Sequence, residues 1–247
     1  MAAQLSVLQL AFALTWVVYV IYLPALAAQA GIDKSHVPLI LAMDQAIFVV
    51  CDWTAGVYAD RVGRAMKRIG GPMAAATLAS CVAFVALPFV APHLGAGVFL
   101  TLTAFWSATS SALRAPPLAL VSRHAPHSEQ TWVVGLYLLG LGLATALAPY
   151  AGLVLKGVDP RIPFVAASAA VAVFALAIAH AERTYAPTPK VSEGEGTRER
   201  PVMGVAGVAI AVVLLALGFQ VHIALNSSPG YLRFVAPEQC SGATKRR

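Results

Sequence analysis

The chain has 247 residues, of which 59% are hydrophobic and only 11% are charged. Soluble domains are typically about 45–50% apolar and about 25% charged, so this composition excludes an ordinary soluble fold. The apolar residues come in unbroken blocks of about 20, long enough to cross a hydrocarbon core of about 30 Å. We therefore predict an all-α protein that crosses the lipid bilayer several times. The net charge of +6 lies mainly in short loops and the tail, which favours membrane orientation over nucleic-acid binding as its cause.

The apolar blocks predict seven membrane spans. The first six cover residues 6–28, 37–58, 73–90, 97–121, 132–155 and 163–180. Residues 182–201 are rich in Pro, Gly, Glu and Arg without apolar periodicity, which predicts a solvated linker. A seventh span covers residues 202–225, and the tail after it contains no eighth. The expected organisation is a six-span unit (1–181), a cytoplasmic linker (182–201), the seventh helix (202–225) and a short polar and basic tail (226–247).

The distribution of Lys and Arg predicts the orientation, because these residues concentrate in the cytoplasmic loops. Residues 59–69 and the linker 182–201 are the most basic connections, whereas the opposite side carries only Lys34, Lys156 and Arg161. We therefore expect the N-terminus in the cytoplasm. The Ala-, Val- and Gly-rich composition favours a bacterial inner membrane. The basic tail 245–247 would then lie outside, although basic residues usually concentrate on the cytoplasmic side.

The end of the second span carries the most specific motif. Residues 56–64 are Gly-Val-Tyr-Ala-Asp-Arg-Val-Gly-Arg. They resemble the signature loop between helices two and three of the major facilitator superfamily (MFS), with the pattern Gly, any, bulky apolar, Ala, Asp, Arg, any, Gly, Arg or Lys. The matching motif residues are Gly56, Ala59, Asp60, Arg61, Gly63 and Arg64. From their chemistry, we expect Asp60 to end the helix and Gly63 to permit a tight turn.

The resemblance implies a fold and a function. The first six helices would form two inverted three-helix repeats, and the protein would be a secondary transporter that moves a small solute by alternating access. In the family the motif Asp helps to latch two halves of the transporter together, which suggests this role for Asp60. A plain basic turn without a latch is the alternative. Residues 140–152 loosely resemble the Gly/Pro pattern of the fifth helix of proton-coupled exporters, which leaves proton coupling open.

Polar side chains inside the spans are the candidate pathway residues. A charged residue at the centre of a span costs about 2.5–3.5 kcal/mol, so it should face protein or water. Asp44 and Asp52 lie about 6 Å on either side of the centre of the second span, and Gln45 shares a face with Asp52. Either carboxylate could carry a proton or contact the solute. Alternatively, Asp44 pairs with a polar group of another span and Asp52 belongs to the latch network.

Further candidates lie in three other spans. Arg114, placed within the fourth span, could bind an anionic solute, pair with an acid or extend to the lipid headgroups. Gln9, Trp16 and Tyr19 share a face of the first span, and Gln220, His222 and Asn226 lie in or next to the seventh; both sets could line a cavity. No metal, cofactor or enzymatic motif such as His-Glu-x-x-His or Gly-x-Ser-x-Gly is present in the sequence.

The sequence also departs from the family it resembles. A complete member would have about twelve spans, whereas this chain supplies seven. We expect a truncated or frame-shifted product, or a fragment. As a lone chain it would need self-association or a separate second half to enclose a pathway. The alternative function is a non-transporting membrane protein, either an interaction module or an inert remnant.

Overall fold

The computed structural model describes residues 2–66, 70–114 and 127–184. All described helices belong to one compact unit, Met1–Lys190. The predicted linker, the seventh span and the tail lie outside the described residues. The candidate residues Gln220, His222 and Asn226 lie outside them for the same reason.

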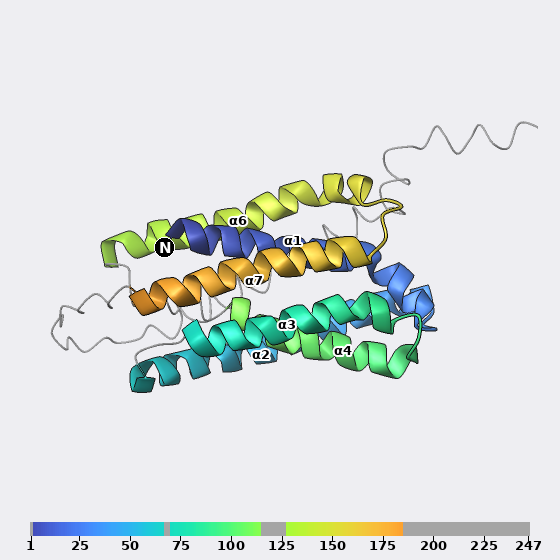
Figure 1. The fold of residues 1–247 in the computed structure, drawn as a ribbon, viewed down its shortest axis with the longest axis horizontal. Coiled ribbons are helices and arrows are strands. Elements are labelled where there is room, and N and C mark those ends of the chain that lie inside the picture. The colour runs from blue at the N-terminus through green and yellow to red at the C-terminus, as the bar shows by residue number, and fades with distance from the viewer. Residues whose placement is uncertain (1, 67–69, 115–126, 185–247) are drawn as a thin grey trace, which may run out of the picture. The chain divides into compact units, whose positions relative to one another are not determined.

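Six long helices make up the described part of the chain (Figure 1). They are α1 (Ala2–Gln29), α2 (Val37–Met66), α3 (Gly70–Val90), α4 (Gly95–Ser110), α6 (His127–Val154) and α7 (Arg161–Thr184). A short 3-10 turn, Lys34–His36, precedes α2, and another, Ser111–Leu113, follows α4. Each long helix, α4 together with the 3-10 turn after it, is long and apolar enough to cross a membrane, which confirms the predicted polytopic all-α architecture.

The helix contacts follow the symmetry expected of two inverted repeats. The first repeat maps onto the second when α1 is exchanged with α4, α2 with α6 and α3 with α7. Under this exchange the α1–α6 contact becomes α4–α2, and the α1–α7 contact becomes α4–α3. The α3–α7 contact maps onto itself, and all five contacts occur. Because each repeat has three spans, the second repeat crosses the membrane in the opposite sense to the first. In Figure 1, α1 lies with α6 and α7, and α4 lies with α2 and α3, so each group combines both repeats.

The second helix corrects two expectations about the motif. α2 continues past Tyr58 to Met66, so Asp60 does not end the helix and Gly63 lies within it rather than in a tight turn. Ala, Arg and Met favour helices, and a single interior Gly costs only about 1 kcal/mol. The helix can therefore continue beyond the apolar span, and the next described helix begins at Gly70.

The fourth helix is shorter than the predicted span of residues 97–121. Its α-helical part ends at Ser110, and Arg114 caps the following 3-10 turn instead of lying within the span. The Ser110 hydroxyl donates to the carbonyl of Ser107 at 2.8 Å, and such side-chain bonds compete with helix geometry. The sequence continues into paired prolines at 116–117, outside the described residues, and proline disfavours a helix just before it.

Large aromatic side chains join four helices in the core. Trp106 of α4 contacts Tyr19 of α1, with ring centroids 4.7 Å apart, and Phe84 of α3, at 4.9 Å. Phe84 in turn stacks on Phe164 of α7 at 4.3 Å. All four side chains are fully buried. Each such ring pair contributes about 0.5–1.5 kcal/mol beyond the area it buries, so this chain of rings fixes the relative positions of the helices.

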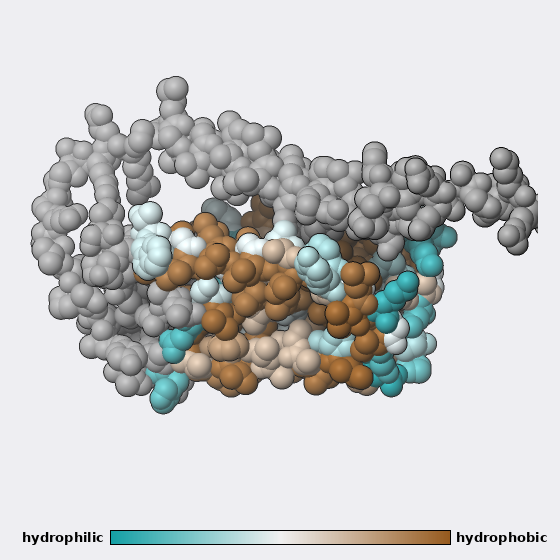
Figure 2. All heavy atoms as spheres, turned by 90° about the horizontal axis from the view of Figure 1, so that it is seen from above, coloured by the Kyte–Doolittle hydropathy of each residue, from teal (hydrophilic) through white to brown (hydrophobic). Residues whose placement is uncertain are grey.

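The described surface is suited to lipid. Figure 2 shows apolar side chains across its middle and hydrophilic ones towards its two ends. Val49 and Trp53 on α2 and Leu153 on α6 are among the exposed apolar residues. A hydrocarbon environment covers such side chains, which agrees with the membrane assignment.

The contact between α1 and α6 depends on Gly140. A Cβ atom at this position would lie 3.0 Å from the backbone nitrogen of Leu10 and still closer to the carbonyl oxygen of Ser6. The two helix backbones therefore approach as closely as the absence of a side chain permits, a common means of helix association in membranes.

We expect Gly140→Ala to destabilise the bundle by about 1–3 kcal/mol, because α6 must move away from α1 to admit the methyl group. Gly142→Ala is the matched control, since a Cβ at Gly142 meets no atom within 4 Å and the helix propensity of both sites rises equally. Unfolding of the two variants in detergent measures the difference. Equal stability of the two variants would contradict the close approach.

Candidate functional site

Asp44 is the centre of the polar core. It lies on α2 and its side chain is fully buried, with 0% exposure. Its Oδ2 accepts a hydrogen bond from the Tyr19 hydroxyl of α1 at 2.7 Å, and its Oδ1 accepts one from the Ser107 hydroxyl of α4, also at 2.7 Å. No described residue forms an ion pair with it. Three helices therefore meet at one carboxylate whose polar partners are hydroxyl groups.

Aromatic rings pack around Tyr19, one of the two partners of this carboxylate. The Tyr19 ring contacts Trp16 at 5.4 Å and Trp106 at 4.7 Å between centroids. Trp16 also contacts Phe48, which lies one turn after Asp44 on α2, at 5.2 Å. We call Asp44, its two hydroxyl partners Tyr19 and Ser107, and the rings of Trp16, Phe48 and Trp106 the Asp44 cluster. The arrangement combines one acidic group with a largely apolar, aromatic wall.

One hydroxyl close to this cluster lacks a partner. Thr103 is fully buried on α4, one turn before Ser107. Its Oγ1 makes no hydrogen bond among the described residues. Buried polar atoms are usually hydrogen-bonded, so an unpaired hydroxyl here is an available group at the site.

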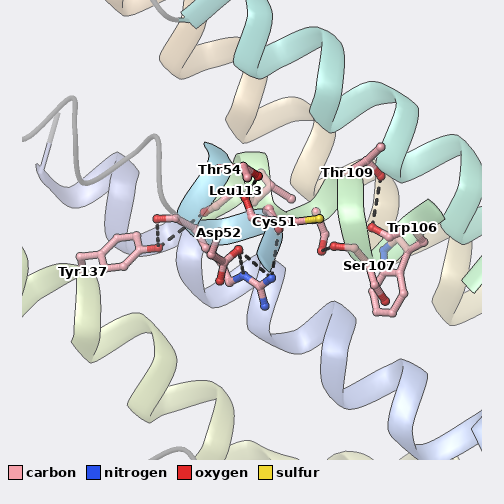
Figure 3. Close-up of polar contacts among 11 residues, drawn as sticks. Cys51, Asp52, Thr54, Trp106, Ser107, Thr109, Leu113 and Tyr137 are labelled. Atoms are coloured by element: carbon pink, nitrogen blue, oxygen red, sulfur yellow. Dashed lines mark hydrogen bonds and ion pairs between the residues drawn. The ribbon is translucent and has the colours of Figure 1, made fainter. Parts of the chain in front are cut away.

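The second polar centre joins α2 to the end of the 3-10 turn after α4. Nε and Nη2 of Arg114 donate to Oδ1 of Asp52 at 3.1 and 2.9 Å, and the two side chains are 21% and 34% exposed. The guanidinium also lies over the Phe48 ring, 3.6 Å from its centroid. In the view of Figure 3, Asp52 lies between Tyr137 and Ser107. Of the three alternatives for Arg114, the structure shows pairing with an acid.

Two tyrosine hydroxyls donate hydrogen bonds to backbone carbonyls just after neighbouring helical segments. Tyr137 of α6 donates to the carbonyl of Arg114 at 3.3 Å, and Tyr22 of α1 donates to the carbonyls of Leu155 at 2.9 Å and Val158 at 3.1 Å. These carbonyls lie just after helical segments, where side chains often supply hydrogen bonds, and that of Leu155 also accepts one from the backbone nitrogen of Val158 at 3.1 Å. Tyr137 thereby fixes the backbone of the residue that carries the guanidinium.

The candidate residues of the second span have separate surroundings in the structure. Asp44 is enclosed by α1 and α4, whereas Asp52 pairs with Arg114 near the end of the span. Gln45 is half-buried on α2. Trp16, Tyr19 and Gln9, which were predicted only to share a face of the first span, are all buried.

The motif residues occupy the last turns of α2. Gly56 is half-buried and Arg61 is exposed. The side chains of Asp60 and Arg64 lie outside the described part of the structure, so the latch role of Asp60 stays a prediction.

Sequence reasoning missed Ser107, Thr103, Phe48 and Tyr137. A signal for the first two was present, because α4 contains an unusual number of hydroxyl residues. These are Thr101, Thr103, Ser107, Thr109 and Ser110, followed directly by Ser111. Hydroxyls in a span also bond to their own helix, as Thr101 does to the carbonyl of Gly97 at 2.8 Å. Composition alone therefore does not reveal which of them reach a neighbouring helix.

Tyr19→Phe tests the bond to Asp44, because it keeps the ring and removes only the hydroxyl. We expect a loss of about 1–3 kcal/mol in the free energy of unfolding, the usual effect of removing a hydrogen bond to a buried charged or polar group. Tyr150→Phe on exposed α6 surface is the control and should change stability by less than about 0.5 kcal/mol. Denaturant unfolding in detergent measures both. The bond is refuted if the two variants behave alike.

A double-mutant cycle tests the ion pair. Because Asp52 and Arg114 contact each other directly, we expect Asp52→Asn and Arg114→Gln to be non-additive, with a coupling energy of about 0.5–2 kcal/mol for this partly exposed pair. Arg161→Gln combined with Asp52→Asn is the control, since Arg161 begins α7 and contacts Phe89 instead. Additive effects in the Asp52 and Arg114 cycle would contradict the observed geometry.

The comparison with known proteins agrees with this architecture. A family model described as Major Facilitator Superfamily matches residues 5–236. No curated protein matches the chain. The matched range contains nearly all of the six described helices, whose contacts follow the inverted-repeat pattern. The chain therefore belongs to the Major Facilitator Superfamily, a superfamily of membrane-embedded secondary transporters.

Proposed function

We propose that this protein moves a small solute by alternating access, with Asp44 as the residue that contacts the solute or a coupling proton. The observation that carries this proposal is the position of Asp44 between the two repeats. Tyr19 and Asp44 belong to the first repeat, and Ser107 belongs to the second. Solute sites in transporters built from inverted repeats lie at the repeat interface near the membrane midplane.

The depth of Asp44 supports this role. The apolar span of α2 is Lys34–Tyr58, so Asp44 lies about 3 Å along the helix axis from its midpoint at 1.5 Å per residue. An ionisable residue at this depth is expensive to place, and it usually marks a pathway for a solute or an ion. Among the described carboxylates, Asp44 alone is fully buried.

The contacts between repeats suggest which parts move. α2 is joined to α4 by the Asp44–Ser107 bond and to the end of the 3-10 turn after α4 by the Asp52–Arg114 pair, two polar links that can open and re-form. By contrast, α1 and α6 approach each other through their backbones at Gly140, which leaves no room for adjustment. We propose that the α2–α4 contact changes during transport and that the Asp52–Arg114 pair acts as its gate.

Several finer parts of the proposal depend on the family. Asp60, together with Gly56, Arg61, Gly63 and Arg64, would latch the N-terminal unit to the second half of the transporter. The residues Gln220, His222 and Asn226 would contribute to the pathway from the seventh helix. The positive-inside distribution supports a cytoplasmic N-terminus, in what we propose is a bacterial inner membrane.

We expect Asp44→Asn to reduce the initial rate of solute uptake into liposomes at least about tenfold, because the amide cannot bind a proton or attract a charge. A panel of radiolabelled solutes and an imposed pH gradient provide the assay. Asp33→Asn is the matched control, since Asp33 is exposed and only caps the turn before α2 through a 2.8 Å bond from the Ser35 nitrogen.

Two outcomes would contradict the proposal in different ways. Equal uptake by Asp44→Asn and the wild type would refute the assignment of Asp44. Absence of uptake by the wild type for every solute, with or without a gradient, would refute transport by the chain itself.

A further inference from the structure

We infer that the solute bound at the Asp44 cluster is an organic cation, such as a protonated amine, a guanidinium or a quaternary ammonium ion. This inference rests on the proposed function of the site and adds the chemical class of its solute. Three features of the described structure support it: the charge balance at Asp44, the aromatic wall around it, and a cation that the same helix face already binds.

The charge balance differs between the two carboxylates of α2. Asp52 is paired with Arg114, whereas Asp44 has only the hydroxyls of Tyr19 and Ser107 as described partners. A buried charge is costly unless an opposite charge accompanies it. A solute with a positive charge would complete the Asp44 cluster, and an anionic solute would be repelled by it.

The aromatic wall favours the same class. Trp16, Tyr19 and Trp106 bring three electron-rich rings together, with centroid distances of 4.7–6.0 Å, and the Tyr19 hydroxyl donates to the carboxylate. Cations bind to the faces of Trp, Tyr and Phe with about 0.5–2 kcal/mol each, and combinations of such rings recognise quaternary ammonium groups. A solute that separates these rings would find an apolar, cation-binding wall.

The molecule already contains an example of this recognition. Asp44, Phe48 and Asp52 are spaced four residues apart on α2, so they form one stripe along the helix. At one end of the stripe, the Arg114 guanidinium lies 3.6 Å from the Phe48 centroid and 2.9 Å from Asp52 Oδ1. At the other end, Asp44 offers a second carboxylate one helical turn before the same ring, without a cation among the described residues.

The unpaired hydroxyl of Thr103 supplies an additional group. It is fully buried, lies one turn before Ser107 on α4 and makes no hydrogen bond in the described structure. A hydroxyl oxygen can accept a hydrogen bond from an ammonium or guanidinium N–H. Asp44 and Thr103 together would hold such a group.

Binding of a matched pair of ions tests the charge preference. Tetraphenylphosphonium and tetraphenylborate have nearly the same shape and opposite charge, and both partition into apolar sites. We expect the purified full-length chain in detergent to bind radiolabelled tetraphenylphosphonium saturably and to bind tetraphenylborate only as weakly as empty micelles do. Saturable binding of tetraphenylborate, or no saturable binding of tetraphenylphosphonium, would overturn the inference.

Variants locate the binding site. We expect Asp44→Asn to raise the dissociation constant for tetraphenylphosphonium at least about tenfold, whereas Asp33→Asn leaves it unchanged. Phe48→Leu, which keeps an apolar side chain of similar size, should raise it several-fold. Thermal unfolding of each variant shows whether it is folded. An unchanged dissociation constant in a folded Asp44→Asn variant would refute the assignment.

The transport assay separates this inference from the proposed function. Asp44-dependent uptake of a neutral or anionic solute would refute the cation class and leave transport through Asp44 standing. Saturable, Asp44-dependent binding of tetraphenylphosphonium without uptake of any solute would support the cation site and refute transport by the chain alone.

Discussion

The two hydrogen bonds to Asp44 are the constraint on which the described bundle depends. Water is absent from the hydrocarbon core, so a carboxylate at that depth must find its partners within the protein. Tyr19 and Ser107 provide them from two other helices, at 2.7 Å each. The contacts of α1 with α2 and α4 are otherwise sparse compared with those between α1 and α6. The carboxylate therefore determines where three helices from two repeats come together.

The rest of the core is arranged around this point. Trp106 neighbours Ser107 on α4 and extends the site through Phe84 to the α3–α7 contact. On α2, Phe48 connects Asp44 to the Asp52–Arg114 pair, and Tyr137 of α6 holds the backbone at Arg114. A change at Asp44 would thus reach the other five described helices through hydrogen bonds, packed rings and one ion pair. This physical continuity is what a transporter needs to couple a bound solute to the movement of its repeats.

The sequence was sufficient for the fold but not for the details of the site. Span length and hydropathy predict the six described helices, because both are properties of local composition. The expectation that Asp60 ends the helix was wrong, since α2 continues to Met66 after the apolar run has ended. The α-helical part of the fourth span also ends earlier than predicted, at Ser110, which hydropathy does not indicate.

For the charged residues, the sequence predicted only the chemical type of the partner, not the residue that provides it. The expectation that Asp44 pairs with a polar group of another span describes the observed bonds, and pairing of Arg114 with an acid was one of three alternatives. The specific partners lie 25, 63 and 62 positions apart in the chain, so only packing reveals them. Hydroxyl residues are common in membrane helices, and only the fold distinguishes Ser107 from its neighbours.

Infrared spectroscopy of the Asp44 carboxyl group is the most direct test of this account. Its bands depend on the hydrogen bonds that its oxygens accept, and Asp44→Asn identifies them by difference. If Tyr19 and Ser107 donate to the two oxygens, Tyr19→Phe and Ser107→Ala should each shift the Asp44 bands of the chain in lipid. Bands that stay at the wild-type position in both variants would show that Asp44 does not join the three helices.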